Sequence, residues 1–284
     1  MTNRSIMILV DGSPGTTALD RVIESARVGG IHVRILVTAI LRPAVNYAYG
    51  LDAYGAFPMS DESADTIEAT KKSLTEQARL IEARLSEEGV SGEVAVLSSD
   101  IFTLQRVVAR MALTVDGLLI GDDVRGDTSL FDTFVQTALF QSPSGLMLNA
   151  VSAPRALTPA RVFVAWNSGL PAARALAAAR TWLADGAEIT VGIFDADATG
   201  THAREVPGSD VARWLSHSGY RVAVQNYPSG GEEIGACILN RARETGADLV
   251  VTGAYGHARM REMIFGGTTR TLMQQTGIPL LLAH

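Results

Sequence analysis

Glycine residues form two clusters near the C-terminus, at positions where they could hold an anion. The first cluster, Gly253-Ala254-Tyr255-Gly256, follows the apolar run Leu249-Val250-Val251-Thr252, which is typical of a buried strand that ends in a turn. The second, Gly266-Gly267, opens a predicted helix that begins with Thr268 and Thr269. Glycine lets backbone N–H groups approach a phosphate closely, and a threonine hydroxyl can cap the helix or bond to a phosphate oxygen. The pattern favours an anion-binding crevice at the carboxyl end of a strand, although the same glycines could serve only to shape a turn and to start a helix.

Short apolar runs alternate with stretches of helical periodicity around these clusters, which predicts βαβ units with parallel strands. In the first half we predict strands at residues 6–10, 32–41, 93–97, 117–120 and 145–148, and helices at 18–28, 62–88, 101–113 and 131–141. In the second half we predict strands at 161–165, 188–194, 221–225, 249–252 and 280–282, and helices at 172–183, 210–217, 232–244 and 268–275. The fold class is therefore α/β.

The two halves repeat the same pattern. Residues 132–150 and 266–284 are equal in length and align without gaps, each placing a helix before a turn and an apolar strand. The best linker is Ser152-Ala153-Pro154-Arg155. We therefore predict two tandem domains, 1–153 and 154–284, each with a doubly wound, five-stranded parallel sheet.

The predicted duplication is not symmetric at the glycine clusters. Gly121-Asp122-Asp123-Val124 stands where the first cluster stands in the second half, and Asp132-Thr133 stands where Gly266-Gly267 does. The three acids Asp122, Asp123 and Asp132 would repel a phosphate. We expect the first domain to have a degenerate site.

The spacing of Gly253, Gly256 and Gly266 resembles the nucleotide-binding motif G-x2-G-x9-G-[S/T] of the universal stress protein family. The resemblance is strong over residues 161–284, and in the first half it rests on the architecture and on Val10-Asp11-Gly12-Ser13. It implies two universal stress protein domains of the adenine nucleotide alpha hydrolase-like fold, whose fifth strands pair to form a pseudo-dimer within one chain. Gly267 departs from the motif because the family has Ser or Thr there.

The resemblance implies an adenine nucleotide, ATP, ADP or AMP, in the second domain, with or without Mg²⁺. Asn167 stands where the family carries an Asp that contacts the adenosine. The expected site residues are Ala165, Trp166, Asn167, Ile193, Thr252, Gly253, Gly256, His257, Arg259, Gly266, Gly267, Thr268 and Thr269. Trp166 could stack on the purine or pack under a helix, and His257 and Arg259 could reach phosphate or lie in a solvated loop.

Catalytic and metal-binding motifs are missing from the sequence. It has no Walker A sequence, no G-x-S-x-G elbow and no motif that pairs a nucleophile with a base. Asp195 and Asp197 are interpreted as a polar loop and not as a metal site, and Cys237 as a buried small hydrophobe. We expect a binding protein and no enzyme; the alternatives are a dimerising interaction protein that binds no nucleotide and a slow ATP hydrolase or phosphotransferase.

Composition narrows the choice of partners. The 284 residues carry a net charge of -6 with no basic stripe, so nucleic acid is an unexpected partner. No apolar run approaches the roughly 20 residues that span a bilayer, and the start lacks the apolar region of a signal peptide, so we expect a cytoplasmic protein that does not enter a membrane. A homodimer and a protein partner of unknown identity are also expected.

Overall fold

The computed structural model of the chain describes residues 4–12, 17–41, 61–195, 207–254 and 267–284. The first half contains β1 (Ser5–Val10), α1 (Thr17–Gly29), β2 (His32–Ile40), α2 (Asp61–Glu87), β3 (Gly92–Ser99), α3 (Ile101–Ala112), β4 (Gly117–Ile120), the 3-10 helix η1 (Asp122–Gly126), α4 (Thr128–Gln141) and β5 (Gly145–Leu148). The second half contains the 3-10 helix η2 (Pro154–Leu157), β6 (Arg161–Ala165), α5 (Leu170–Arg180), β7 (Glu188–Phe194), α6 (Ser209–His217), β8 (Arg221–Tyr227), α7 (Ile234–Glu244), β9 (Leu249–Gly253), α8 (Gly267–Gln274) and β10 (Leu280–Ala283).

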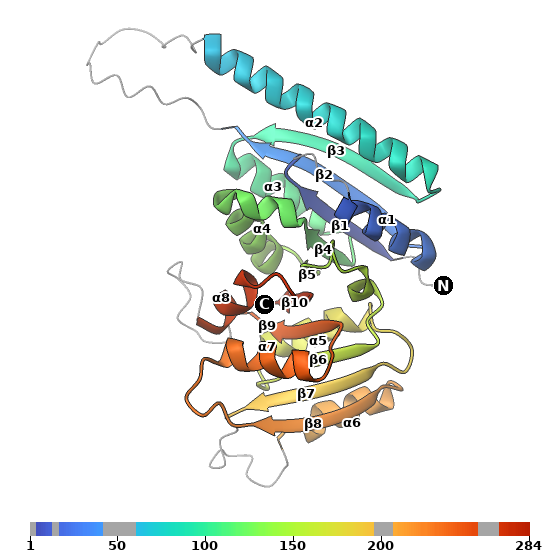
Figure 1. Ribbon diagram of the computed structural model, residues 1–284, viewed down its shortest axis with the longest axis vertical. Helices are drawn as coiled ribbons and strands as arrows, with labels where there is room; N and C mark the ends of the chain where they lie inside the picture. Colours follow the sequence, from blue (N-terminus) through green and yellow to red (C-terminus); the bar gives the residue numbers. More distant parts are fainter. Residues whose placement is uncertain (1–3, 13–16, 42–60, 196–206, 255–266) are drawn as a thin grey trace, which may run out of the picture.

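One sheet of ten strands runs through both halves (Figure 1), in the order β3-β2-β1-β4-β5-β10-β9-β6-β7-β8. All neighbouring strands are parallel except β5 and β10, which are antiparallel. Each half therefore repeats one doubly wound order, and the predicted α/β class is confirmed. Because the two halves meet through antiparallel strands, the carboxyl ends of their parallel strands lie at opposite edges of the sheet.

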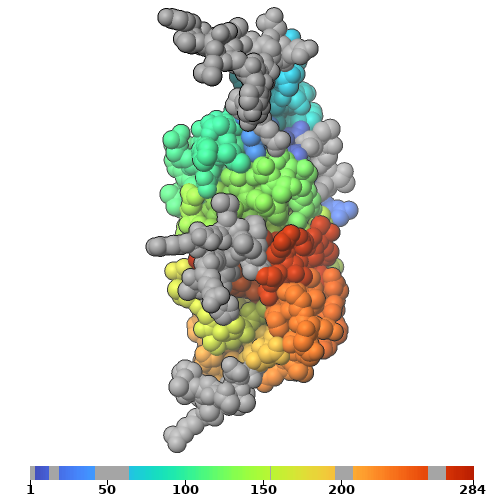
Figure 2. Space-filling view, turned by 90° about the vertical axis from the view of Figure 1, so that its left-hand side faces the viewer, coloured from blue at the N-terminus to red at the C-terminus, as the bar shows by residue number. Residues whose placement is uncertain are grey.

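Helices cover both faces of the sheet, and each face has one hydrophobic core that both halves share. Helices α1, α2, α5 and α6 contribute buried residues to the first core, and α3, α4, α7 and α8 to the second. The central strands read as continuous apolar runs because they are covered on both faces; every residue of β4 and β5 is buried. In the space-filling view the halves are stacked along the long axis of the molecule (Figure 2).

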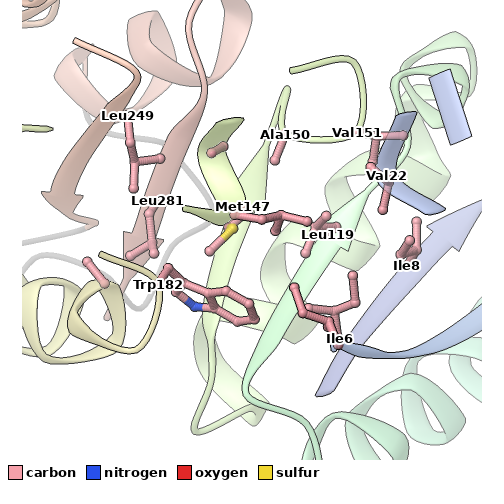
Figure 3. Packing of buried hydrophobic residues seen from close by; sticks show 14 of the residues in the cluster. Ile6, Ile8, Val22, Leu119, Met147, Ala150, Val151, Trp182, Leu249 and Leu281 are labelled. Atoms are coloured by element: carbon pink, nitrogen blue, oxygen red, sulfur yellow. The ribbon is translucent and has the colours of Figure 1, made fainter. Parts of the chain in front are cut away.

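The seam between the halves is a packed interior, as Figure 3 shows. Met147 on β5 pairs with Leu281 on β10, and these two residues hold the same position in the two aligned repeats. Trp182, which is fully buried, reaches from the second half to Gly117 on β4, where a Cβ atom would lie 2.7 Å from the indole. The guanidinium of Arg4 lies 5.1 Å from the centre of the Trp182 ring. The predicted pairing of the fifth strands into a pseudo-dimer is confirmed.

Two local features differ from the sequence-based expectation. The linker is not an open loop: it leads into η2, whose Ala156 and Leu157 are buried in the first core. Helix α7 begins two residues later than predicted because Glu233 is its N-cap, with a carboxylate oxygen that accepts the N–H of Ala236 at 2.8 Å. The domain limits 1–153 and 154–284 stay a prediction.

Among the helices of the described ranges, none combines the length and the apolar character that crossing a membrane requires.

Candidate functional site

The order of strands in the second half defines where a ligand would bind. From β6 the chain continues to β7 on one side and later returns to β9 on the other, so the switch point lies between β6 and β9. Ala165, the last residue of β6, pairs with Thr252 on β9 and with Gly192 on β7. Three strands therefore end together, and they bring the predicted residues Ala165 and Thr252 side by side. Ile193 and Gly253 come one position later on their strands.

The turn after β6 is shaped by Asn167 and Ser168. The side-chain oxygen of Asn167 accepts the backbone N–H of Gly169 at 3.0 Å, which closes a tight turn into α5. Ser168 has a left-handed backbone with φ of 57°, and Gly12 has the same conformation, with φ of 76°, after β1 in the first half. The shared conformation identifies Asn167 as the counterpart of Asp11. An amide therefore replaces a carboxylate at the end of the first strand of the second half.

Trp166 and Ile193 lie on one face of the sheet. Trp166 packs half-buried against the core shared with α5 and α6, and Ile193 is buried in the same core. The indole N–H of Trp166 is buried and has no hydrogen-bond partner in the described part of the chain. Of the two interpretations offered for Trp166, the structure shows packing against the core.

Gly253 touches the beginning of α5. A Cβ atom on Gly253 would lie 2.6 Å from the carbonyl carbon of Pro171 and closer still to the backbone nitrogen of Ala172. Only glycine permits this approach between the end of β9 and the first turn of α5, so the residue has a packing role whether or not a ligand binds. The sequence could not reveal this role because the contact joins segments about eighty residues apart.

The start of α8 is open around Gly267. This residue is exposed, and a Cβ atom placed on it would meet no atom of the described residues within 4 Å. Thr268 is partly buried, and its carbonyl oxygen lies 2.9 Å from the position that a Cβ atom on Gly235 of α7 would take. Thr269 is buried. Of the two threonines that follow Gly267, Thr268 is therefore the more exposed.

Four predicted site residues lie outside the described residues: Gly256, His257, Arg259 and Gly266. The sequence analysis missed His284, whose Nδ1 lies 3.1 Å from the carbonyl oxygen of Ala254, directly after Gly253. The His284 ring also makes an edge contact with Phe140 of α4, with 4.8 Å between ring centres. A lone histidine at the end of an apolar strand carries no sequence signal for these contacts.

Within the described ranges, no cluster of three or more His, Cys, Asp or Glu residues is placed to hold a metal ion. Asp195 accepts the backbone N–H of Ser229 at 2.8 Å, and hydrogen bonds with Ser229 hold the pKa of Asp195 below its ordinary value. Asp195 thus fixes a turn, while Asp197 lies outside the described residues. Cys237 is buried as predicted, and burial, followed by the nearby Glu232 carboxylate, raises the pKa of its thiol.

The equivalent crevice of the first half is occupied by the chain's own carboxylates. Asp123 accepts the backbone N–H of Asp11 at 2.8 Å, across the switch point between β1 and β4. Burial raises the pKa of Asp123 to about 6, and the Asp11 carboxyl adds to the shift while the Asp11 backbone N–H opposes it. Asp127 caps α4 by accepting the N–H groups of Ser129 and Leu130 at 3.0 and 3.2 Å.

The other two acids predicted for the first crevice, Asp132 and Asp122, are both partly buried. Asp132 is partly buried in α4, and this burial raises its pKa. Asp122 lies in η1 and is partly buried. Asp122 and Asp123 therefore follow Gly121 in the first half, where Ala254 and Tyr255 follow Gly253 in the sequence of the second half.

Comparisons with known proteins agree with this architecture. Residues 229–284 match the universal stress protein family. A universal stress protein of Synechocystis sp. (strain ATCC 27184 / PCC 6803 / Kazusa) is 31% identical over 67 residues, which are 24% of this chain and 22% of that protein. The alignment thus spans less than a quarter of this relative's length.

Solved structures match the whole chain. A universal stress protein from Archaeoglobus fulgidus DSM 4304 superposes with a TM-score of 0.64 and 15% identity, covering 100% of this chain and 99% of that one. A functionally unknown protein from Pseudomonas aeruginosa PAO1 gives a TM-score of 0.54 and 13% identity, covering 99% and 92%. At these identities the likeness concerns the fold. The whole chain therefore has the fold of solved universal stress protein structures, and residues 229–284 are similar in sequence to that family.

Proposed function

We propose that the second half binds an adenine nucleotide and that the protein is a stress-response binding module. The observation that carries the proposal is the contrast between the two switch points. In the second half, β6 and β9 end in Ala165 and Gly253, and Asn167 follows β6; none of the three brings a charge to the crevice. In the first half, Asp123 places a carboxyl group across the corresponding switch point, on the backbone N–H of Asp11. The glycine spacing and the match of residues 229–284 to the universal stress protein family support the same assignment.

Each part of the proposed ligand has a group of candidate residues. The base and the ribose would lie near four residues at, or directly after, the ends of β6 and β7: Ala165, Trp166, Asn167 and Ile193. Glycine-rich turns after β9 and before α8 would hold the phosphates with backbone N–H groups. Mg²⁺, if it takes part, would be carried by the phosphates, because hard cations prefer oxygen ligands.

Binding without catalysis is the function that the described residues favour. Asn167 offers an amide where an acid could act as a base, and Asp195 is engaged with Ser229. Slow ATP hydrolysis would need a residue able to activate water near the phosphates. We therefore propose hydrolysis only as an outcome to be tested, by asking whether turnover depends on Mg²⁺ and on Gly256.

The first experiment is to denature the purified protein and identify any released small molecule by mass spectrometry. Calorimetric titration of the nucleotide-free protein with ATP, ADP and AMP follows. About one adenine nucleotide per chain is expected, because one of the two crevices is filled by the chain's own carboxylates. Neither a released ligand nor heat on titration would contradict the proposal and favour an interaction protein without a nucleotide.

A matched pair of variants tests the phosphate end of the site. Gly267→Ser adds the hydroxyl that the family motif carries, and Gly267→Ala adds the same Cβ atom without it; this Cβ meets no atom of the described part of the chain within 4 Å. We expect the serine variant to bind ATP about ten-fold more tightly than the alanine variant, which corresponds to the lower end of the worth of one hydrogen bond to a charged group, about 1.5 kcal/mol. Equal affinities would remove Gly267 from the phosphate site.

A homodimer stays part of the proposal. Both fifth strands, β5 and β10, are already paired inside the chain, so a second copy would have to use another surface. Sedimentation of the purified protein over a range of concentrations distinguishes a monomer from a dimer.

A further inference from the structure

Arg125 belongs to the first half, yet its side chain ends on helix α8 of the second half. One guanidinium nitrogen donates to the carbonyl oxygen of Met273 at 2.8 Å, and the other donates to the side-chain oxygen of Asn149, also at 2.8 Å. The ring of Phe131 lies 4.7 Å from the guanidinium carbon. Met273 is in the last turn of α8, where carbonyl groups lack helical partners and a positive charge is favourable.

Asn149 extends the same contact beyond the helix. It is 2% exposed, has a left-handed backbone with φ of 59°, and donates through its side-chain nitrogen to the carbonyl oxygens of Gln275 and Ile278, each at 3.0 Å. A non-glycine residue in this conformation persists only where its surroundings hold it. We call Arg125 and Asn149 the α8 clamp. Together they fix the chain from the end of α8 to the start of β10.

The 3-10 helix η1, which carries Arg125, is itself held by a hydrogen bond. Arg125 lies in η1, directly after the segment in which Asp123 accepts the backbone N–H of Asp11. The acids that fill the first crevice therefore also hold the turn that carries Arg125. The clamp has no mirror image, because the residue aligned with Asn149 in the second repeat is Ala283, which has no polar side chain.

Because α8 is short and stiff, contacts that hold its C-terminal end also set the position of its N-terminal end. The helix has eight residues and is about 12 Å long, so a tilt at Met273 moves its first turn, which holds Gly267 and Thr268. We propose that Arg125 is a positioning residue that holds the start of α8 where it can bind the phosphates of a nucleotide. The inference rests on the proposed nucleotide site and adds to it a dependence on the first half.

The test compares ligands that share a base but differ in phosphates. Calorimetry with ATP, ADP, AMP and adenosine is run on the full chain and on Arg125→Met, Arg125→Lys and Asn149→Gly, with Arg106→Met, at an exposed position of α3, as the control. We expect Arg125→Met to weaken ATP about ten-fold and adenosine less than two-fold, with Arg125→Lys in between. Hydrogen exchange of the α8 amides should become faster in Arg125→Met and stay unchanged in Arg106→Met.

The outcomes separate the two proposals. A wild-type chain that binds no nucleotide refutes the proposed function, and the inference about Arg125 falls with it. A wild-type chain that binds ATP while Arg125→Met loses ATP and adenosine equally, or loses neither, overturns the inference alone. Asn149→Gly keeps the left-handed backbone and removes the side-chain donors, so it provides the same comparison if Arg125→Met does not fold.

Discussion

The two crevices of this molecule have the same strand order and the same left-handed turn after the first strand, but their contents differ. In the first half, Asp123 crosses the switch point to bond with Asp11, and Asp127 caps the next helix. In the second half, β9 ends in Gly253 against α5, and the next helix begins with the exposed Gly267. Among the described residues, the first switch point therefore holds a carboxyl group of the chain itself, whereas Asn167 and Gly253 bring no charge to the second.

The largest difference in stability is expected between alanine variants of two glycines: Gly253, which ends β9, and Gly121, which follows β4. Gly253→Ala should lower the free energy of unfolding by about 3 kcal/mol, because the new Cβ atom would overlap the backbone of Pro171 and Ala172, which cannot turn aside. Gly121→Ala should cost about 2 kcal/mol, since its nearest obstacle is the Asp123 side chain, which can move only by giving up its hydrogen bond with Asp11, while the Leu9 carbonyl oxygen lies 3.0 Å away. Urea unfolding of both variants measures the two values.

An equal loss in the two glycine variants would contradict the comparison, since it would mean that β9 approaches α5 no more tightly than β4 approaches its own surroundings. Gly277→Ala is the control, because no atom lies within 4 Å of the position of its added Cβ.

The charge in the first crevice should appear as a pH dependence of stability. The folded chain keeps the proton of Asp123 up to about pH 6, whereas the unfolded chain releases it near pH 3.8. The free energy of unfolding should therefore fall as pH rises through this window, by on the order of 2 kcal/mol. Asp123→Asn keeps the oxygen that accepts the Asp11 N–H but cannot ionise, so it should lack this fall and be more stable than the wild type at pH 7.

Urea titrations of both proteins from pH 4 to pH 7 give the measurement. Parallel curves for the wild type and Asp123→Asn would show that the Asp123 carboxyl titrates as it does in the unfolded chain, and they would remove the electrostatic contrast between the crevices.

The smallest effect is expected in the turn that follows each first strand. Ser168 has a φ of 57°, where a side chain is strained, while its counterpart Gly12 has the same backbone without one. Ser168→Gly should therefore stabilise the chain by about 0.5 kcal/mol, and Gly12→Ala should destabilise it, because the new Cβ would also meet Leu74 of α2. Thermal unfolding compares the pair; a loss of stability in Ser168→Gly would indicate that the hydroxyl supports the turn.

Much of the fold could be predicted because its signals are local. Strands such as 161–165 and 188–194 have the predicted limits, since a run of apolar residues between turn residues needs both faces of a sheet to bury it. Helix α5 begins earlier than predicted because Pro171 fits the first turn of a helix, and it ends earlier, at Arg180. The 3-10 helices η1 and η2 were missed, as they have too few residues to show a periodicity.

The candidate site was less predictable because its contacts join distant segments. The glycine spacing pointed to the end of β9 and the family resemblance to the end of β6, and the strand register brings these two ends together. Nothing in the spacing shows that Gly253 lies against α5, or that Arg125 reaches Met273, 148 residues away. Such contacts depend on how the repeats meet, and the repeats differ in sequence at those points.

The pairing of Met147 with Leu281 has a consequence for how the molecule responds to dilution. Two separate chains joined through such strands would dissociate as their concentration falls, whereas strands within one chain stay together at an effective concentration set by the connection between them. The assembly, the single core on each face and any affinity that depends on Arg125 should therefore be independent of how much protein a cell contains. Fusion also allows one repeat to change its crevice without forcing the same change on its neighbour, which two identical subunits cannot do.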